Sequence, residues 1–181
     1  MSIPKSYRLE IKGLVRDLRV VEVVPGVHIG ILKLATDAEL TEAVGKALAA
    51  KLPRDVEVLV MPDGKAQSLL HVIERETRLP SVLARKSRKS YMREPVLDTL
   101  ATSITTQERH AFYLDADDVD RIRGRKVAII DDVVSSGGTI KAMQGLLELA
   151  GAASTVVLAV GTEGDRRDDV IALHHFPVYT G

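Results

Sequence analysis

The sequence contains no cysteine, and this absence excludes disulfide scaffolds, thiol catalysis and cysteine-ligated metal sites together. Neither sign of charge is in excess, because 25 Lys and Arg residues balance 25 Asp and Glu residues, so no general attraction to nucleic acid or anionic membranes is expected. No apolar stretch approaches the roughly 20 residues that span a bilayer, and residues 1–10 lack the apolar block of a signal peptide. We expect a cytoplasmic protein that binds neither nucleic acid nor a membrane.

The 181 residues are 45% hydrophobic, which is enough for a full core without a metal or a disulfide. Short apolar runs typical of buried strands alternate with stretches in which apolar residues recur at helical spacing. Helical crossovers of this kind join parallel strands and cover both faces of the sheet. We therefore predict one α/β domain, residues 1–181, with a mainly parallel sheet flanked by helices on both faces. The predicted strands cover residues 56–61, 81–84, 126–130 and 155–160.

The N-terminal segment shows a different pattern. Residues 11–18 carry apolar side chains on one helical face, which predicts a short helix. The β-rich runs VVEVV and VHIGIL follow on either side of Pro25 and Gly26, which predicts a hairpin-like piece. Thr36 and Glu39 then form a Thr-x-x-Glu capping box, which predicts the start of the first helix of the alternating part.

Residues 87–110 interrupt the alternation. Charged and small residues dominate this segment, and Pro95 breaks any helix across its middle. Loops of this length inside a compact domain are uncommon and are often active-site lids, although a plain surface excursion is the simpler alternative. The runs ATSIT and HAFYL within it predict an antiparallel flap.

Polar clusters follow three of the predicted strands and indicate a ligand site. In open parallel sheets, ligands bind beyond the carboxyl ends of the strands, because the loops there converge and helix N-termini point inward. Two of the clusters offer cations and glycine amides, and the third offers carboxylates and an anion-accepting turn. This combination suits a polyanion attached to a polyol. The clusters are Asp63, Gly64 and Lys65; Arg85, Lys86 and Lys89; and residues 131–139.

The run VAIIDDVVSSGGTI, residues 127–140, carries the strongest signal. Its four uninterrupted apolar residues predict a strand buried on both faces, so Asp131 and Asp132 are expected at its carboxyl end, facing a ligand. Ionised carboxylates accept hydrogen bonds from a pair of sugar hydroxyls and can also hold Mg²⁺ through water. The small residues that follow leave the backbone amides of residues 135–139 free to surround a phosphate at a helix N-terminus.

Each of these features also has a plainer structural interpretation. Two adjacent glycines usually form a tight turn, and an Asp pair alone is usually a solvated strand end. Their combination between an apolar strand and a helix favours phosphate binding. The basic run after residue 84 is as consistent with a solvated surface as with a site. A Walker A loop is excluded, because Ala66 follows Gly64 and Lys65 where Ser or Thr is required.

The sequence VAIIDDVVSSGGT resembles the phosphoribosyl diphosphate (PRPP) binding motif of the type I phosphoribosyltransferases, and the similarity extends over roughly residues 20–165. The order of VPGVHIGILKLATDAEL, MPDGKAQ, LPSVLARKSRK and SSGGTIKAM resembles the purine branch, adenine and xanthine enzymes especially. Ile29 stands where adenine enzymes usually carry an aromatic residue, and SITTQE is more similar to the xanthine enzymes. The base therefore stays open, with adenine the first choice and xanthine, hypoxanthine and guanine next.

The resemblance implies a role for each polar cluster. Asp131 and Asp132 would bind the ribose hydroxyls and help to hold Mg²⁺, and together with Lys86 they form the implied catalytic set. The implied contacts to the 5′-phosphate are Val134, Ser135, Ser136, Gly137, Gly138 and Thr139. The implied contacts to the diphosphate are Asp63, Gly64, Lys65, Ala66, Arg85 and Lys89.

The resemblance also divides the chain. Residues 1–35 would form a small N-terminal hood, in which Val27 and Ile29 line the base pocket. Residues 87–110 would form a flexible loop that closes over the site, and Glu94 or Glu108 in this loop is a candidate general acid or base.

The implied function is transfer of the 5-phosphoribosyl group from PRPP to a purine base, giving a purine nucleotide and diphosphate, with Mg²⁺ as cofactor. In such enzymes, basic residues of the second cluster often meet the diphosphate across a dimer interface, so the resemblance implies a homodimer. A PRPP-binding regulator without turnover is the alternative. Purine-responsive repressors of similar sequence add an N-terminal DNA-binding domain, for which we expect the roughly 20 residues before the run VVEVV to be too few.

Overall fold

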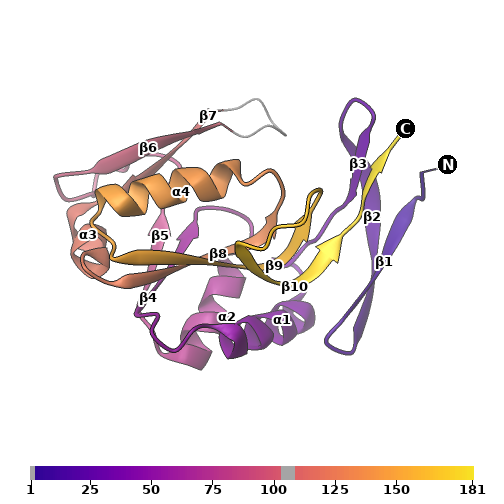
Figure 1. Ribbon diagram of the computed structural model, residues 1–181, viewed down its shortest axis with the longest axis horizontal. Helices are drawn as coiled ribbons and strands as arrows, with labels where there is room; N and C mark the ends of the chain where they lie inside the picture. The colour runs from indigo at the N-terminus through magenta and orange to yellow at the C-terminus, as the bar shows by residue number, and fades with distance from the viewer. Residues whose placement is uncertain (1–2, 103–108) are drawn as a thin grey trace.

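The computed structural model describes residues 3–102 and 109–181, which form two main sheets, a hairpin and four helices (Figure 1). The strands are β1 (Ser6–Ile11), β2 (Leu14–Val24), β3 (Val27–Gly30), β4 (Val58–Pro62), β5 (Ser81–Ala84), β6 (Leu97–Thr102), β7 (Arg109–Leu114), β8 (Lys126–Val134), β9 (Ser154–Glu163), β10 (Val170–Phe176) and β11 (Val178–Thr180). The helices are α1 (Ala38–Lys51), α2 (Gln67–Thr77), α3 (Ala116–Ile122) and α4 (Gly138–Leu149). Within the described ranges, none of the helices has the length and apolar character needed to cross a bilayer.

Five parallel strands form the central sheet in the order β10-β9-β8-β4-β5. The apolar runs at residues 56–61, 81–84, 126–130 and 155–160 correspond to β4, β5, β8 and β9. All of β4 and residues 127–130 of β8 are buried, as expected for strands that are covered on both faces. The predicted α/β fold with a mainly parallel sheet is confirmed.

Helices cover both faces of the central sheet (Figure 1). Leu59 and Met61 of β4 lie in a core cluster with α1 and α2, whereas Val58 and Val60 lie in the cluster that contains α3 and α4. Residues of β8 divide between the two clusters in the same alternating way. Successive strand residues point to opposite faces, so a continuous apolar run supplies both cores at once.

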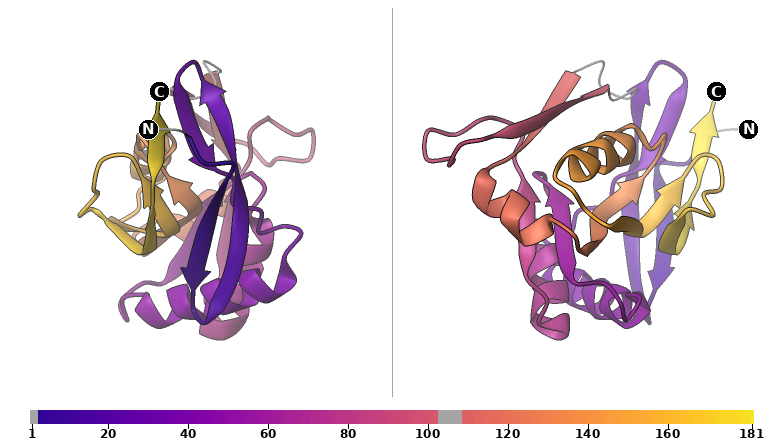
Figure 2. Two further views of the ribbon diagram at one scale, coloured as in Figure 1. Left: turned by 90° about the vertical axis from the view of Figure 1, so that its right-hand side faces the viewer. Right: turned by 60° about the vertical axis from the view of Figure 1, so that its left-hand side comes forward.

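An antiparallel sheet of β1, β2, β3 and β11, called the hood sheet below, packs at one side of the molecule (Figures 1 and 2). The helix predicted over residues 11–18 is wrong. Ile11 pairs directly with Leu14, and Lys12 and Gly13 between them form a two-residue turn with φ values of 52° and 77°. Positive φ at both turn positions matches the twist of a hairpin, so the apolar residues here alternate across two strands instead of winding round a helix.

The hairpin predicted around Pro25 and Gly26 is confirmed as the antiparallel pair β2 and β3. The fourth strand of the hood sheet was not predicted from the sequence. It comes from the C-terminus, where Val178 pairs with Ile29 and Thr180 pairs with Val27. The two ends of the chain therefore complete one sheet.

The β6–β7 hairpin, called the flap below, contains the predicted antiparallel pair. Its register runs from Leu97 opposite Leu114 to Thr102 opposite Arg109, so β6 begins earlier than the run ATSIT. Residues 103–108, SITTQE, lie outside the described residues. Phe112 and Leu114 of β7 are buried in the core cluster of α4, and the flap lies beside that helix (Figures 1 and 2).

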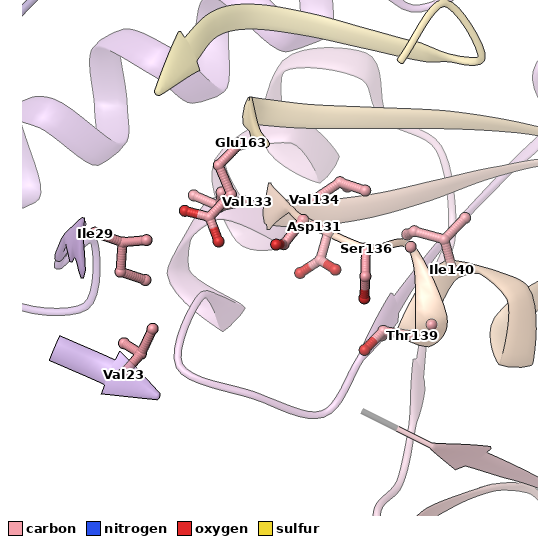
Figure 3. A pocket seen from close by; sticks show the side chains of 12 residues that line it. Val23, Ile29, Asp131, Val133, Val134, Ser136, Thr139, Ile140 and Glu163 are labelled. Carbon is pink, nitrogen blue, oxygen red and sulfur yellow. The ribbon is translucent and has the colours of Figure 1, made fainter. Parts of the chain in front are cut away.

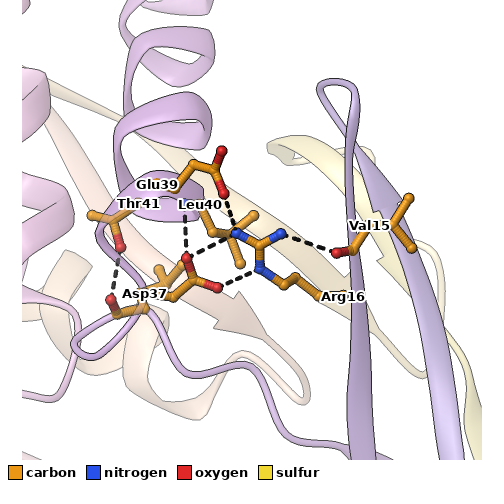
Figure 4. A network of polar contacts seen from close by, with 7 residues as sticks. Val15, Arg16, Asp37, Glu39, Leu40 and Thr41 are labelled. Carbon is orange, nitrogen blue, oxygen red and sulfur yellow. Dashed lines mark hydrogen bonds and ion pairs between the residues drawn. The ribbon is translucent and has the colours of Figure 1, made fainter.

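A charged cluster attaches the hood sheet to α1 (Figure 4). The predicted Thr36–Glu39 capping box is wrong by one residue, because Asp37 is the N-cap and its Oδ1 accepts a hydrogen bond from the Leu40 N–H at 3.0 Å. Arg16 of β2 donates to Asp37 Oδ2 at 2.6 Å and to Glu39 Oε2 at 2.7 Å. The Arg16 guanidinium holds the pKa of the Asp37 carboxyl below its ordinary value.

Two helical glycines should respond oppositely to substitution by alanine. A Cβ at Gly45 of α1 would lie 2.5 Å from Val72 Cγ1, so Gly45→Ala is expected to lower the free energy of unfolding by about 1–3 kcal/mol through overpacking. A Cβ at Gly145 of α4 would meet nothing closer than 4.0 Å. Gly145→Ala is therefore expected to raise the free energy of unfolding by up to about 1 kcal/mol, because alanine favours the helix more than glycine does. Urea denaturation of both variants measures the two changes, and equal effects would contradict close packing of α1 on α2.

Asp37→Ala should destabilise the protein in a pH-dependent way. At neutral pH the loss of the N-cap is expected to cost about 1–2 kcal/mol of unfolding free energy. The pKa of Asp37 is lower in the folded than in the unfolded protein, so its contribution is present above about pH 4 and is lost as the pH falls through the folded value. Denaturation of the wild type and the variant across this range should show the difference shrinking in acid, and a constant difference would contradict the Arg16 contact.

Candidate active site

The carboxyl ends of β4, β5 and β8 meet at one edge of the central sheet, beside the hood sheet (Figure 1). A cavity of about 350 Å³ lies there, between the turn that follows β8 and the strands β2 and β3 (Figure 3). Its lining combines main-chain atoms of a small-residue turn with carboxylates and aliphatic side chains. The lining residues are Val23, Ile29, Asp131, Val133, Val134, Ser135, Ser136, Gly137, Gly138, Thr139, Ile140 and Glu163.

A second cavity of about 450 Å³ adjoins the first, and the two share Ile29, Asp131, Val133 and Thr139. The turn after β4, residues 63–66, forms one wall and is called the lysine loop below. The remaining lining residues are Met61, Pro62, Asp63, Gly64, Lys65, Ala66, Lys86, Phe112 and Asp132. The structure therefore brings two of the three predicted polar clusters, and Lys86 of the third, around one continuous space.

Residues 134–139, called the glycine loop below, present backbone amides to the first cavity. Gly137 is the N-cap of α4 and has a φ of 79°, a conformation that glycine adopts without strain. No described side chain caps this helix, and its first turn contains no acidic residue. The free N–H groups and the positive end of the helix dipole therefore favour an anion at this position.

Asp131 and Asp132, called the acid pair below, lie inside β8. The strand was expected to end at Ile130, but its pairing with β9 continues to Val134 opposite Thr162. Asp131 Oδ1 accepts a hydrogen bond from the Asp132 N–H at 2.9 Å, and Asp132 Oδ1 accepts one from the Val133 N–H at 2.8 Å. Burial and the neighbouring Asp132 charge raise the pKa of Asp131 well above its ordinary value, an effect that Lys86 partly opposes.

The lysine loop is held by contacts of its first residue. The Asp63 N–H donates to the Ala84 carbonyl at 2.8 Å, and Asp63 Oδ1 accepts from Gln67 Nε2 at 2.7 Å. Asp63 Oδ2 lies 3.7 Å from Arg85 Nη1, so this arginine borders the loop as an ion-pair partner. These contacts leave Lys65 and Lys86 as the cations of the second cavity.

Several residues named from the sequence lie away from the described linings of the two cavities. Arg85 and Lys89 are not among the lining residues, and Lys89 is exposed on the segment after β5. Val27 pairs with Val24 and Thr180 in the hood sheet, and Val23 takes the expected position beside Ile29. Glu94 forms an ion pair with Arg88 and borders a different cavity, whereas Glu108 lies outside the described residues.

Glu163, the last residue of β9, lines the first cavity but was not predicted. Only 7% of its surface is exposed, and burial raises the pKa of its carboxyl, with a smaller contribution from the Asp132 charge. A hydrogen bond with the Ser135 side chain opposes this shift. The available signal was an acid after a fourth apolar run, TVVLAVGTEG, which ends at the same edge of a parallel sheet.

Comparison with known proteins identifies the chain. The sequence model of the phosphoribosyl transferase domain matches residues 36–174. The chain belongs to the phosphoribosyltransferase family. Similar proteins include an adenine phosphoribosyltransferase of Rhodococcus opacus. It is 35% identical over 149 residues, and the match covers 78% of this chain and 79% of that protein. An orotate phosphoribosyltransferase of Methanopyrus kandleri is 29% identical over 134 residues, 74% of this chain and 61% of that protein.

The fold of this phosphoribosyltransferase also agrees with solved structures. An adenine phosphoribosyltransferase from Thermoanaerobacter pseudethanolicus superposes with a TM-score of 0.73 at 20% sequence identity, covering 88% of this chain and 95% of that one. At this identity the likeness shows the fold. Together with the adenine-enzyme relatives, it confirms the resemblance to the type I family of the purine branch.

Gly137→Ala should impair the glycine loop of the phosphoribosyltransferase. The φ of 79° disfavours alanine, and the new Cβ would lie 1.9 Å from Arg167 Nη1, which packs over this residue. We expect the affinity for PRPP, measured by calorimetry, to fall about tenfold or more. Gly124→Ala is the matched control, because its φ is 72° and no atom lies within 4 Å of the added Cβ. Unchanged PRPP affinity in Gly137→Ala would contradict binding at this loop.

Proposed function

We propose that this protein transfers the 5-phosphoribosyl group from PRPP to a purine base, giving a purine nucleotide and diphosphate. Adenine is the first choice of base, because adenine enzymes are among the relatives above 30% identity. The observation that carries the proposal is the continuous space in which the glycine loop, the acid pair and the lysine loop meet. In the two adjoining cavities, the anion-binding glycine loop and lysine loop lie on either side of the acid pair, which can hold a sugar.

The order of groups along the cavities fits the order of groups in PRPP. The glycine loop receives the 5′-phosphate through backbone N–H groups and the hydroxyls of Ser135, Ser136 and Thr139. The acid pair accepts hydrogen bonds from the ribose hydroxyls, because ionised carboxylates are acceptors. The lysine loop and Lys86 receive the diphosphate, and the base lies toward Ile29 and Val23 of the hood sheet. Binding of both anionic ends fixes the anomeric carbon between them.

The transfer step separates charge, and the site residues stabilise both parts. As the bond between the anomeric carbon and the diphosphate breaks, positive charge grows on the ribose and negative charge grows on the leaving group. The acid pair stabilises the ribose charge, and Lys65 and Lys86 stabilise the diphosphate charge. A ring nitrogen of the base then forms the new bond to the anomeric carbon. Closing of the proposed flexible loop, residues 87–110, over the site excludes water from this reactive carbon.

The acid pair also fits Mg²⁺. Burial and the adjacent Asp132 carboxylate raise the pKa of Asp131, and a bound cation would relieve the repulsion between the two carboxylates. Asp131 and Asp132 would hold Mg²⁺ directly or through water, because this ion keeps several waters and takes few protein ligands. When bound, Mg²⁺ would supply positive charge that stabilises the leaving diphosphate.

The proposal includes the arrangement of the chain. Residues 1–181 act as one phosphoribosyltransferase domain in the cytoplasm, with residues 1–35 as its hood. The protein works as a homodimer, in which exposed Lys89 and half-buried Arg85 reach the diphosphate of the partner protomer. Arg85 and Lys89 do not line the described cavities of their own protomer, and the homodimer would bring them to the cavity of the partner.

Incubation with PRPP, Mg²⁺ and each of adenine, guanine, hypoxanthine and xanthine, followed by chromatographic separation, tests the proposal. We expect at least one base to give its nucleotide and an equal amount of diphosphate. Asp132→Asn should weaken PRPP binding with little change in unfolding free energy, whereas Asp17→Asn, the same change at an exposed hood position, should leave PRPP binding unchanged. If PRPP raises the melting temperature but no base is converted, the protein is instead a non-catalytic PRPP-binding regulator.

A further inference from the structure

Glu163 lies where the first cavity changes from polar to apolar. Figure 3 shows the glycine loop residues Ser136 and Thr139 at one end of this cavity and Val23 and Ile29 at the other. Asp131 lies between these ends, and the Glu163 carboxylate lies between Asp131 and Ile29. The side chain thus occupies the part of the cavity beyond the acid pair, as seen from the glycine loop.

Glu163 has no ion-pair partner among the described residues. Arg166 and Arg167 border an adjoining cavity with it, but Arg167 pairs with Asp169 instead, and Asp132 adds a like charge. Ser135 is a neutral polar side chain close to the carboxylate. A carboxylate that is 7% exposed loses hydration, and this loss is unfavourable unless other donors replace the water. A ligand that brings N–H donors into the cavity supplies them.

The order of groups in a nucleotide identifies that ligand. With the phosphate in the glycine loop and the ribose at the acid pair, the base must lie on the side of the ribose away from the phosphate. Ile29 and Val23 there offer aliphatic contacts to the flat faces of a ring, and Glu163 is the charged group at its edge. The edge of the base is therefore the part of the substrate that meets this carboxylate.

A carboxylate discriminates between the substituents of purines. It can only accept hydrogen bonds, so an exocyclic amino group on the ring gives a favourable N–H to oxygen contact. An oxo group at the same ring position brings two acceptors together and leaves both unsatisfied in a buried site. Sites that hydrogen-bond a particular substrate group reject analogues that lack it far more strongly than apolar pockets do.

We propose that Glu163 is a specificity-determining residue, which accepts a hydrogen bond from the exocyclic amino group of the base and so selects aminopurines over oxopurines. This inference rests on the proposed phosphoribosyl transfer and names the class of base within it. Adenine, with an amino group at C6, belongs to the favoured class; guanine, with an amino group at C2 and an oxo group at C6, belongs to it where the C2 edge meets Glu163; and hypoxanthine and xanthine carry no amino group.

Two matched pairs of bases test the proposal. Adenine and hypoxanthine differ by an amino or an oxo group at C6, and guanine and xanthine differ in the same way at C2. With saturating PRPP and Mg²⁺, we expect the amino member of at least one pair to have a kcat/KM about tenfold or more above its oxo partner. Glu163→Gln offers both a donor and an acceptor, so it is expected to reduce this ratio about tenfold while the KM for PRPP stays unchanged.

Two further variants separate recognition from a structural role. Glu163→Asp keeps the carboxylate one methylene further back, so it should retain the preference for the amino base at a lower kcat/KM. Glu148→Gln makes the same chemical change on the exposed end of α4 and should alter neither the ratio nor either rate. A ratio in Glu163→Gln equal to that of the wild type, or an equal loss for both members of a pair, would overturn the proposal.

Equilibrium dialysis of the four bases with the protein and ribose 5-phosphate separates this inference from the proposed transfer. Preferential binding of an amino base that Glu163→Gln abolishes supports the inference even if no nucleotide forms, in which case the transfer fails alone. Nucleotide formation without an amino preference overturns the inference alone. If no base binds or reacts, both fail.

Discussion

Partial burial of the acid pair at the edge of the core is the constraint on which the rest of the site depends. β8 is the central strand of a parallel sheet, and its apolar residues are buried on both faces. Asp131 and Asp132 continue the same strand, so their charges lie next to a dry interior, and the pKa of Asp131 is raised in consequence. Such an arrangement is unfavourable by itself, and the hydroxyl groups and the cation of the proposed substrate complex would offset its cost.

The walls of the first cavity come from segments that lie far apart in the sequence. The glycine loop follows β8 directly, but the opposite wall belongs to the hood sheet, which the N-terminal strands form together with β11. Arg16 fixes the hood sheet to the start of α1 by two short ion pairs, and α1 packs on the face of the central sheet through the second core cluster. The distance between Ile29 and the acid pair therefore depends on packing far from the site.

The central sheet could be read from the sequence because its signals are local. Runs such as 126–130 are apolar throughout, and a strand buried on both faces is the structure that fits them. The two-residue turn at Lys12 and Gly13 was missed because four apolar residues at positions 11, 14, 15 and 18 fit a helical face as well as a strand pair. Pairing of β2 with β3 favours the strand over the helix, and this long-range contact is not visible in the periodicity of the sequence.

The sequence by itself determined four of the five strands of the central sheet and the order of strand, acid pair and glycine loop, because a strand, its following turn and the next helix are set by neighbouring residues. Only the tertiary structure decided that Glu163 and Val23 line the same cavity, that Arg167 lies against Gly137, and that β11 completes the hood sheet. These positions follow from the order of strands in the two sheets. That order depends on which buried faces fit together across long stretches of chain, and no local pattern encodes it.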